Sequence, residues 1–400
     1  MPAPNKELNN DDAEDERPHR RNGSIGDRLG QVPERVPPGA LKEQFLAPTP
    51  SHVVKLGVLG GDGIGPEVTE AALLVLDACE SRYGFQTERT SFDWSGEQYL
   101  RDGRRFDAAA LEPIRKLDAV LMGAIGHPEA PRGLLEHDII FGFRRGLDLY
   151  VNLRPLVLYD PKLCPLKDKT EKDIQILIMR ENTEDVYGRK GTTTGAGTPD
   201  ERVSADMIFT RRGIERITRY GFERARQLGH KKVTLVDKSN AIAIQQLWRD
   251  IFEEVAPDYP DVEHDAMYVD AACMWMVQKP EQFSVIVTTN LFGDIISDLG
   301  AALCGGLGTG ASGNIHPGRV SMFEPIHGSA PKYTGQKAAS PIGAIGAVAL
   351  LLEHVGVPAA SSAITAAIFS AFRTGLITGV EARKGRTFED AKIIADLVAG

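Results

Sequence analysis

Three arginines have the residue type and the spacing to bind a substrate that carries more than one carboxylate. Arg144 and Arg154 flank a short apolar segment, and Arg180 directly follows an apolar run. A planar guanidinium group binds a carboxylate through two parallel hydrogen bonds. A single arginine more often belongs to a solvated charged surface, and we interpret Arg145, beside Arg144, in that way. Three arginines near the ends of expected strands together indicate a polycarboxylate substrate.

Two aspartates four residues apart indicate a cation site. Asp294 and Asp298 stand among apolar residues, and on a helix they would share one face about one turn apart. Like charges repel there, so a positive group is expected between them. Mg²⁺ or Mn²⁺ suits such oxygen ligands, and Asp270 is a candidate third ligand. The alternative is a helix cap combined with an arginine pair.

Lys238 and Tyr187 are the acid–base candidates. Lys238 follows an apolar run, and Tyr187 lies seven residues after Arg180. Each of them, taken singly, is more often structural. In combination with a cation and several arginines, an amine and a phenol fit proton transfer on a polycarboxylate.

These side chains need a scaffold, and the apolar pattern predicts an α/β fold. The run 53–59 predicts a strand, 60–65 a tight turn, and Pro66 suits the first turn of a helix. Helical spacing over 212–228 alternates with further short apolar runs, at 119–122, 174–179, 233–236 and 285–287. Ligands of such folds lie beyond the carboxyl ends of strands, where Arg180, Lys238 and Asn290 follow their runs. Because Pro66 replaces the last glycine of GxGxxG, we do not expect a Rossmann phosphate site.

Composition excludes several classes of protein. The 400 residues are 42% hydrophobic and 25% charged, which is ordinary for globular chains of two or three domains. A net charge of −9 gives no signature of nucleic-acid or membrane-surface binding. No apolar run reaches the length of about 20 residues that spans a membrane. Four well-separated cysteines indicate a reducing compartment, so we expect a cytoplasmic protein.

The first 50 residues differ from the rest. They hold 8 of the 24 prolines and both charge signs without an apolar period, which predicts a disordered N-terminal extension of residues 1–50. Residues 51–400 are the expected folded domain.

Six segments in order make this chain resemble the β-decarboxylating dehydrogenases, which act on isopropylmalate, isocitrate, homoisocitrate, tartrate or D-malate. The likeness runs from about Lys55 to about residue 375. The segments are 61–67 (Gly-Asp-Gly-Ile-Gly-Pro-Glu), 149–155 (Leu-Tyr-Val-Asn-Leu-Arg-Pro), 180–184 (Arg-Glu-Asn-Thr-Glu), 237–240 (Asp-Lys-Ser-Asn), 290–298 (Asn-Leu-Phe-Gly-Asp-Ile-Ile-Ser-Asp) and 323–331 (Phe-Glu-Pro-Ile-His-Gly-Ser-Ala-Pro).

The resemblance implies a doubly wound, isopropylmalate dehydrogenase-like fold with a non-Rossmann cofactor site. It implies two subdomains, one of about 51–149 with 305–400 and one of about 150–304. It also implies a homodimer with shared active sites.

The resemblance also implies roles for the candidate residues. Arg144, Arg154 and Arg180 would hold the substrate carboxylates, and Lys238 and Tyr187 would be the acid–base pair. Asp294 and Asp298 would bind the metal in one subunit, while Lys238 and Asp270 would reach the metal and substrate from the other. The cofactor, NAD or NADP, would lie against His327, Gly328, Ser329, Ala330, Pro331, Lys332, Tyr333 and Ser340.

The implied reaction is metal-dependent oxidative decarboxylation of a 2-hydroxy dicarboxylate. Ile140 and Phe141 stand where the family reads the substrate's side group, and an apolar pair favours the alkyl group of 3-isopropylmalate, as in leucine biosynthesis. D-malate, tartrate, isocitrate, homoisocitrate or an analogue from specialised metabolism are the alternatives. Lys332 resembles NADP-dependent members, which places NADP slightly ahead of NAD. A non-catalytic regulatory subunit is disfavoured because the metal and acid–base residues are all in place.

Overall fold

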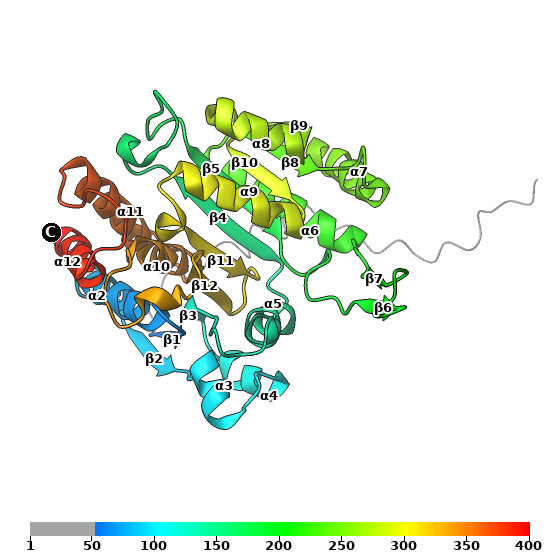
Figure 1. Cartoon of the computed structure of the whole chain (residues 1–400). Helices are drawn as coiled ribbons and strands as arrows, with labels where there is room; N and C mark the ends of the chain where they lie inside the picture. The colour runs from blue at the N-terminus through cyan, green and yellow to red at the C-terminus, as the bar shows by residue number, and fades with distance from the viewer. Residues whose placement is uncertain (1–52) are drawn as a thin grey trace, which may run out of the picture. The chain divides into compact units, whose positions relative to one another are not determined.

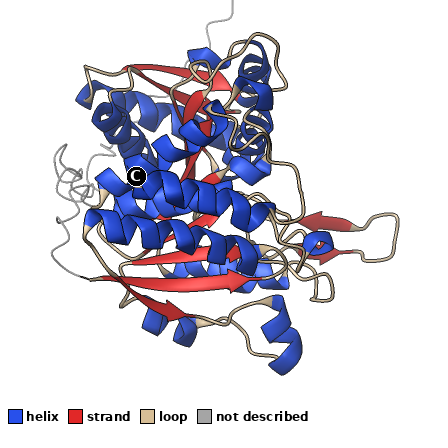
Figure 2. Ribbon diagram, turned by 90° about the vertical axis from the view of Figure 1, so that its left-hand side faces the viewer, coloured by secondary structure: helices blue, strands red, loops and turns tan. Residues whose placement is uncertain are grey.

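The computed structural model describes residues 53–400, so the predicted disordered extension lies outside the described residues. Ten strands of this part form one mixed sheet with helices against both faces, which confirms the predicted α/β class (Figures 1 and 2). Within residues 53–400, no helix is both long and apolar enough to cross a membrane.

The sheet consists of two parallel groups of strands joined by an antiparallel centre. The order is β2-β1-β3-β12-β11-β4-β5-β10-β8-β9. Strand β11 runs antiparallel to both β12 and β4, and β4 runs antiparallel to β5. The strands are β1 (Val54–Gly61), β2 (Thr87–Ser91), β3 (Ala119–Ala124), β4 (Val151–Val157), β5 (Gln175–Glu181), β8 (Lys232–Asp237), β9 (Glu263–Tyr268), β10 (Val285–Thr288), β11 (Ala311–Ile315) and β12 (Ser321–Pro325). A separate hairpin of β6 (Thr192–Thr194) and β7 (Arg202–Ser204) stands out beside this sheet (Figure 1).

The helices are α2 (Gly65–Tyr83), α3 (Gly96–Asp102), α4 (Ala108–Ile114), α5 (Phe141–Gly146), α6 (Arg211–Leu228), α7 (Gln246–Val255), α8 (Val269–Gln278), α9 (Asn290–Leu303), α10 (Ile342–His354), α11 (Pro358–Arg373) and α12 (Arg386–Ala399). Two of the helices were predicted, one that starts near Pro66 and one over 212–228, and α2 and α6 confirm them. Pro66 lies in the first turn of α2, as expected, where its missing N–H is no loss. Single turns of other helical types connect several elements, including a π-helical turn, η2 (Glu136–Ile140).

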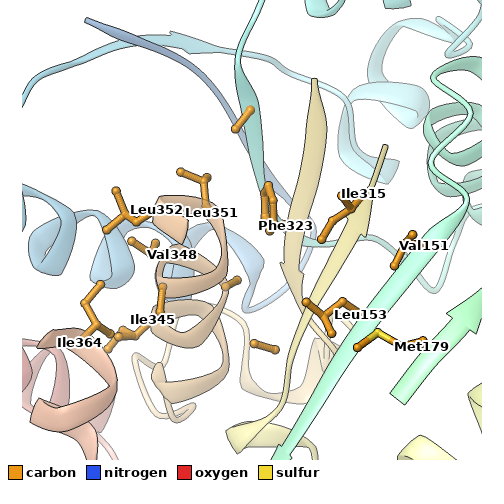
Figure 3. Close-up of a cluster of buried hydrophobic side chains, with 14 of the residues drawn as sticks. Val151, Leu153, Met179, Ile315, Phe323, Ile345, Val348, Leu351, Leu352 and Ile364 are labelled. Atoms are coloured by element: carbon orange, nitrogen blue, oxygen red, sulfur yellow. The ribbon is translucent and has the colours of Figure 1, made fainter. Parts of the chain in front are cut away.

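Three hydrophobic clusters cover the sheet. The largest packs α2, α6, α10, α11 and α12 onto one face. Figure 3 shows Ile345 and Val348 of α10 on the side of that helix near Ile364 of α11, with Phe323 and Leu153 on the strands across the helix. On the other face, one cluster packs the segment 106–147 onto β1, β3 and β12. The third packs α8 and α9 onto β4, β5 and β10. The centre of this second face, between the two smaller clusters, carries polar side chains.

The predicted strands at 53–59, 119–122, 174–179, 233–236 and 285–287 correspond to β1, β3, β5, β8 and β10. Strands β4, β11 and β12, at the antiparallel centre, were not predicted. Their alternate residues are polar, as at Asn152 and Arg154 of β4 and Ser312 and Asn314 of β11, so they contain no continuous apolar run. Strands β1, β2, β3, β11 and β12 come from the first expected subdomain, and the other strands of the sheet from the second. The boundary between subdomains stays a prediction.

Candidate active site

Alternation along the central strands builds a polar strip across the sheet. Leu153 of β4 points into the largest hydrophobic cluster, so its neighbours Asn152 and Arg154 point to the opposite face. Asn314 of β11 and Arg180 of β5 lie on paired positions beside Asn152. All of these polar residues are buried, which demands partners for each of them.

Arg180 is the most deeply buried cation of the strip. Its Nε donates to Asn290 Oδ1 at 2.9 Å, and its Nη1 pairs with Asp294 Oδ1 at 2.5 Å. A Cβ on Gly293 would lie 2.6 Å from Arg180 Cγ, so glycine lets α9 approach the strand this closely. Burial and the neighbouring arginines lower the pKa of Arg180 to about 9, which leaves it charged at neutral pH.

Arg154 is the positive group between the two predicted metal ligands. Its Nη1 lies 3.3 Å from Asp294 Oδ1 and 3.6 Å from Asp298 Oδ1. The two aspartates share one face of α9, as predicted, and their side chains are 38% and 57% exposed. Burial alone would raise the pKa of Asp294, but Arg180 and Arg154 outweigh it and hold that pKa below its usual value. At Asp298 burial prevails over Arg154, and the pKa is raised.

Tyr187 joins this cluster through its hydroxyl. The hydroxyl donates to Asp294 Oδ2 at 2.8 Å, and the ring lies under the guanidinium of Arg180, 5.3 Å from its centroid. Burial, followed by the charge of Asp294, raises the pKa of Tyr187 to about 12, so the phenol keeps its proton at neutral pH. The ring of Phe141 meets it edge-on at 6.1 Å, whereas Ile140, the last residue of η2, packs against the hydrophobic cluster of the segment 106–147.

Arg145 was interpreted as part of a solvated charged surface, but its side chain also binds the backbone of another segment. It is exposed, but its Nη2 donates to the carbonyl oxygen of Tyr187 at 2.5 Å and its Nη1 to that of Gly188 at 3.2 Å. The same guanidinium lies 5.6 Å from the ring centroid of Phe141. Arg145 therefore ties the segment expected to read the substrate to the backbone of the expected acid. Its partners are more than 40 residues away in sequence, so the local pattern could not reveal them.

Lys238 and Asp270 form a separate pair at the other end of the sheet. Lys238 follows β8, Asp270 lies in the first turn of α8, and Lys238 Nζ is 2.5 Å from Asp270 Oδ1. The Asp270 side chain is 68% exposed. Within residues 53–400, no three His, Cys, Asp or Glu side chains are grouped to hold a metal. The structure thus brings Asp294 and Asp298 together in one chain, with Asp270 elsewhere.

The donor set of this chain fits part of a divalent-cation site. Asp294 and Asp298 supply the carboxylate oxygens that hard cations take, and both are partly open to solvent. Mg²⁺ takes six oxygen ligands in an octahedron, so two carboxylates leave positions for substrate, water and a further carboxylate.

The residues expected at the cofactor lie in the loop between β12 and α10. This loop contains a single helical turn, η8 (Pro331–Tyr333). A Cβ on Gly63 would collide with the carbonyl oxygen of Ser329, which accepts the N–H of Ile64, so the glycine-rich turn after β1 packs directly against the loop. His327 Nε2 is buried without a partner, as a group waiting for a ligand would be. The loop therefore offers one buried nitrogen to a ligand, and its role in cofactor binding stays a prediction.

The ends of this loop differ in exposure. Gly328 and Lys332 are exposed, Ala330 and Tyr333 are half-buried, and the Nζ of Lys332 lies 4.7 Å from the Tyr333 ring centroid. Ser340 is buried, and its hydroxyl accepts the N–H of Ile342 at 3.4 Å at the start of α10. The structure thus separates Ser340 from the open part of the loop.

Arg144, at the end of α5, is also buried in the strip, where its Nε donates to Asn314 Oδ1 at 3.0 Å. The fold and the polar strip define an α/β protein that gathers three guanidinium groups, two carboxylates and a phenol, a set that suits an anionic ligand. A family model described as isocitrate/isopropylmalate dehydrogenase matches residues 55–393. The chain is 43% identical over 321 residues to the 3-isopropylmalate dehydrogenase of Thermobifida fusca, covering 80% of this chain and 91% of that protein. It is 46% identical over 319 residues to the 3-isopropylmalate dehydrogenase of Corynebacterium diphtheriae, covering 79% and 92%. A crystal structure of isocitrate dehydrogenase from Methylococcus capsulatus matches with a TM-score of 0.77 and 33% identity, over 87% of this chain and all of that one.

The chain belongs to the isocitrate/isopropylmalate dehydrogenase family. It is therefore a β-decarboxylating dehydrogenase, and the predicted family, fold class and enzyme class are confirmed. Membership brings a divalent metal and an NAD-type cofactor.

Proposed function

We propose that this enzyme oxidises and decarboxylates 3-isopropylmalate to 2-oxo-isocaproate, the reaction type of leucine biosynthesis, and that it works in the cytoplasm. One observation carries the proposal: three buried arginines and a protonated tyrosine share one polar strip, and the apolar ring of Phe141 lies against that tyrosine. The names of the relatives support the same substrate.

In the proposed mechanism the arginines Arg144, Arg154 and Arg180 bind and orient the two carboxylates of the substrate. When bound beside His327, the nicotinamide cofactor would supply the hydride acceptor for C2, and a divalent cation, Mg²⁺ or Mn²⁺, held by Asp294 and Asp298, would supply Lewis-acid chemistry. Lys238 takes the proton of the C2 hydroxyl. The C3 carboxylate then leaves as CO₂, and Tyr187 donates its proton to C3.

We further propose that the working enzyme is a homodimer with shared sites. Asp294 and Asp298 would hold the cation in one subunit, and Lys238 and Asp270 of the partner subunit would complete that site. The separation of the Lys238–Asp270 pair from Asp294 within one chain supports this arrangement. The two proposed subdomains, about 51–149 with 305–400 and about 150–304, would meet at the polar strip.

The substrate side group is tested by a panel of 3-substituted malates. Because an unpaired carboxylate against Ile140 and Phe141 would lose its hydration without gaining a partner, we expect a larger kcat/KM for (2R,3S)-3-isopropylmalate than for isocitrate, with Mg²⁺ or Mn²⁺ present. A higher value for isocitrate or homoisocitrate would overturn the substrate assignment. The bulk of Phe141 favours D-malate or tartrate as the second candidate, and both belong in the panel.

Cofactor choice depends on Lys332 in the proposed adenosine loop. We propose that NADP is preferred over NAD, because the exposed ammonium of Lys332 would attract a 2′-phosphate. Lys332→Asp should shift the ratio of kcat/KM values toward NAD, and Lys332→Gln should shift it less. An unchanged ratio in both variants would exclude this role for Lys332. The experiment leaves the substrate assignment untouched, since the hydroxy acid is the same throughout.

A further inference from the structure

A network of buried amides centred on Asn314 connects two of the three arginines in the polar strip. Asn314 of β11 is fully buried, and its Oδ1 accepts three hydrogen bonds. The donors are Arg144 Nε at 3.0 Å, Asn152 Nδ2 at 2.9 Å and Asn182 Nδ2 at 2.9 Å. The other side of the amide donates from Nδ2 to Glu324 Oε1 at 2.7 Å.

The partners of Asn314 fix which way its amide faces. A carbonyl oxygen can only accept and an amide nitrogen can only donate. Three donors converge on one end and a carboxylate lies at the other, so rotating the amide by 180° would oppose donor to donor and acceptor to acceptor. The burial of every group in this network would make each lost partner costly.

The network extends from Asn314 to the second arginine. Asn152 donates to Asn314 through Nδ2, and its own Oδ1 accepts the Nε–H of Arg154 at 2.7 Å. Arg144 and Arg154 thus each use Nε on the network, directly or through one amide. Their terminal nitrogens meet other groups: Arg154 Nη1 donates to Ser297 Oγ at 2.6 Å and lies beside Asp294, and Arg144 Nη2 lies 3.6 Å from Glu324 Oε1. Arg180 is held differently, through Asn290, and has no bond to Asn314.

We propose that Asn314 is a positioning residue that sets the orientation of Arg144 and Arg154 for the two carboxylates of the substrate. This inference rests on the proposed function insofar as the substrate is a dicarboxylate. It does not depend on the identity of the 3-substituent, the metal or the nicotinamide cofactor. It also separates the arginines into two sets, with Arg180 independent of Asn314.

The test uses the full chain without metal or cofactor, with malonate as a minimal dicarboxylate probe in titration calorimetry. Asn314→Ala should raise the malonate Kd about 10-fold or more, because a hydrogen bond to a charged group is lost and a second is loosened. Asn314→Asp keeps an accepting oxygen for Arg144 but opposes a second oxygen to Glu324, so it should not restore the malonate affinity. Gln98→Ala is the matched control, since Gln98 is an equally buried amide whose side chain bonds only Asp102 and Arg104. It should leave the Kd unchanged.

Steady-state kinetics supply a second readout that a general loss of stability would not give. The KM for the hydroxy acid should rise in Asn314→Ala, while the KM for the nicotinamide cofactor stays near the wild-type value. If Asn314→Ala does not fold, Asn314→Ser is measured in its place, because serine keeps a polar side chain too short to reach all four partners. A folded variant whose malonate Kd is within twofold of wild type would overturn the inference. Wild-type malonate binding without turnover of isopropylmalate would instead overturn the proposed function and leave the role of Asn314 intact.

Discussion

The arginine strip and the Lys238–Asp270 pair are built in opposite ways. Arg144, Arg154 and Arg180 have side chains that are 1–9% exposed, and each is bonded to at least two groups. The Asp270 carboxylate is 68% exposed, and its ion pair is with the neighbouring amine of Lys238. A rigid, pre-organised arrangement suits groups that bind a charged ligand, because these groups then need no reorganisation on binding. The exposed Lys238–Asp270 pair suits groups that contact their ligands only after the partner subunit of the proposed dimer has bound.

The largest expected effect tests whether the two regions act together across subunits. Lys238→Ala and Asp294→Asn should each lower kcat by about 10²–10⁴-fold, since one removes the base and the other a cation ligand. When the two variants are co-expressed with different affinity tags and the mixed dimer is isolated, about half of the wild-type activity should return. One site of that dimer carries both substitutions and the other carries neither.

The mixed dimer also distinguishes the competing arrangement. If each site were formed within a single chain, every site of the mixed dimer would keep one damaging substitution. Its activity would then stay at the level of the single variants. The homodimers of each variant, purified through the same two tags, are the matched controls for carry-over of wild-type protein.

The adjacent residues Arg144 and Arg145 sharpen the same contrast at smaller scale. Arg144 is buried in the strip, whereas Arg145 is exposed and holds the carbonyl oxygens of Tyr187 and Gly188. Arg145→Ala should lower kcat about 10-fold with little change in the KM for the hydroxy acid, because the phenol loses its placement while the carboxylate-binding groups remain. Arg145→Lys keeps the positive charge and one donor group, so its kcat should lie between those of the wild type and Arg145→Ala. Equal losses in kcat and in malonate affinity would show that Arg145 acts on binding instead.

The strand ends and the α9 aspartates could be predicted from sequence, whereas the contacts of the arginine strip could not. The carboxyl-end positions of Arg180, Lys238 and Asn290 followed from apolar runs that stop at polar residues, and β5, β8 and β10 bear this out. The shared face of Asp294 and Asp298 followed from helical spacing.

The antiparallel centre could not be obtained in this way. Asn314 is 170 residues from Arg144 and 162 from Asn152, so their hydrogen bonds depend on strand pairing that no local pattern encodes. A period of two, apolar at 151 and 153 and polar at 152 and 154, was the available signal. It predicts a half-buried strand with a polar face, but not which residues that face will meet. Spacing made the three arginines candidates, and the family resemblance implied that they act on one substrate, because a family pattern carries such long-range information.

The smallest effect concerns two neighbouring buried charges, Arg180 and Glu181. Arg180 has the full countercharge of Asp294, whereas Glu181 accepts neutral donors from Thr183 and Glu184 and lies 3.9 Å from Arg216. Burial therefore outweighs these hydrogen bonds and raises the pKa of Glu181 from 4.5 to about 7. A folded-state pKa above the unfolded value means that this group favours the folded state fully below about pH 4.5, and that the contribution is lost as the pH rises through 7.

Glu181→Gln should remove this dependence, because the amide does not titrate. The Tm of wild type minus that of the variant should therefore fall by about 3 °C between pH 5 and pH 8. Other buried groups that titrate in this range, such as Asp390 with its pKa raised by burial to about 6, are common to both proteins and cancel in the difference. A difference that stays constant with pH would mean that Glu181 remains ionised beside Arg216, and that the second buried charge is compensated as fully as the first.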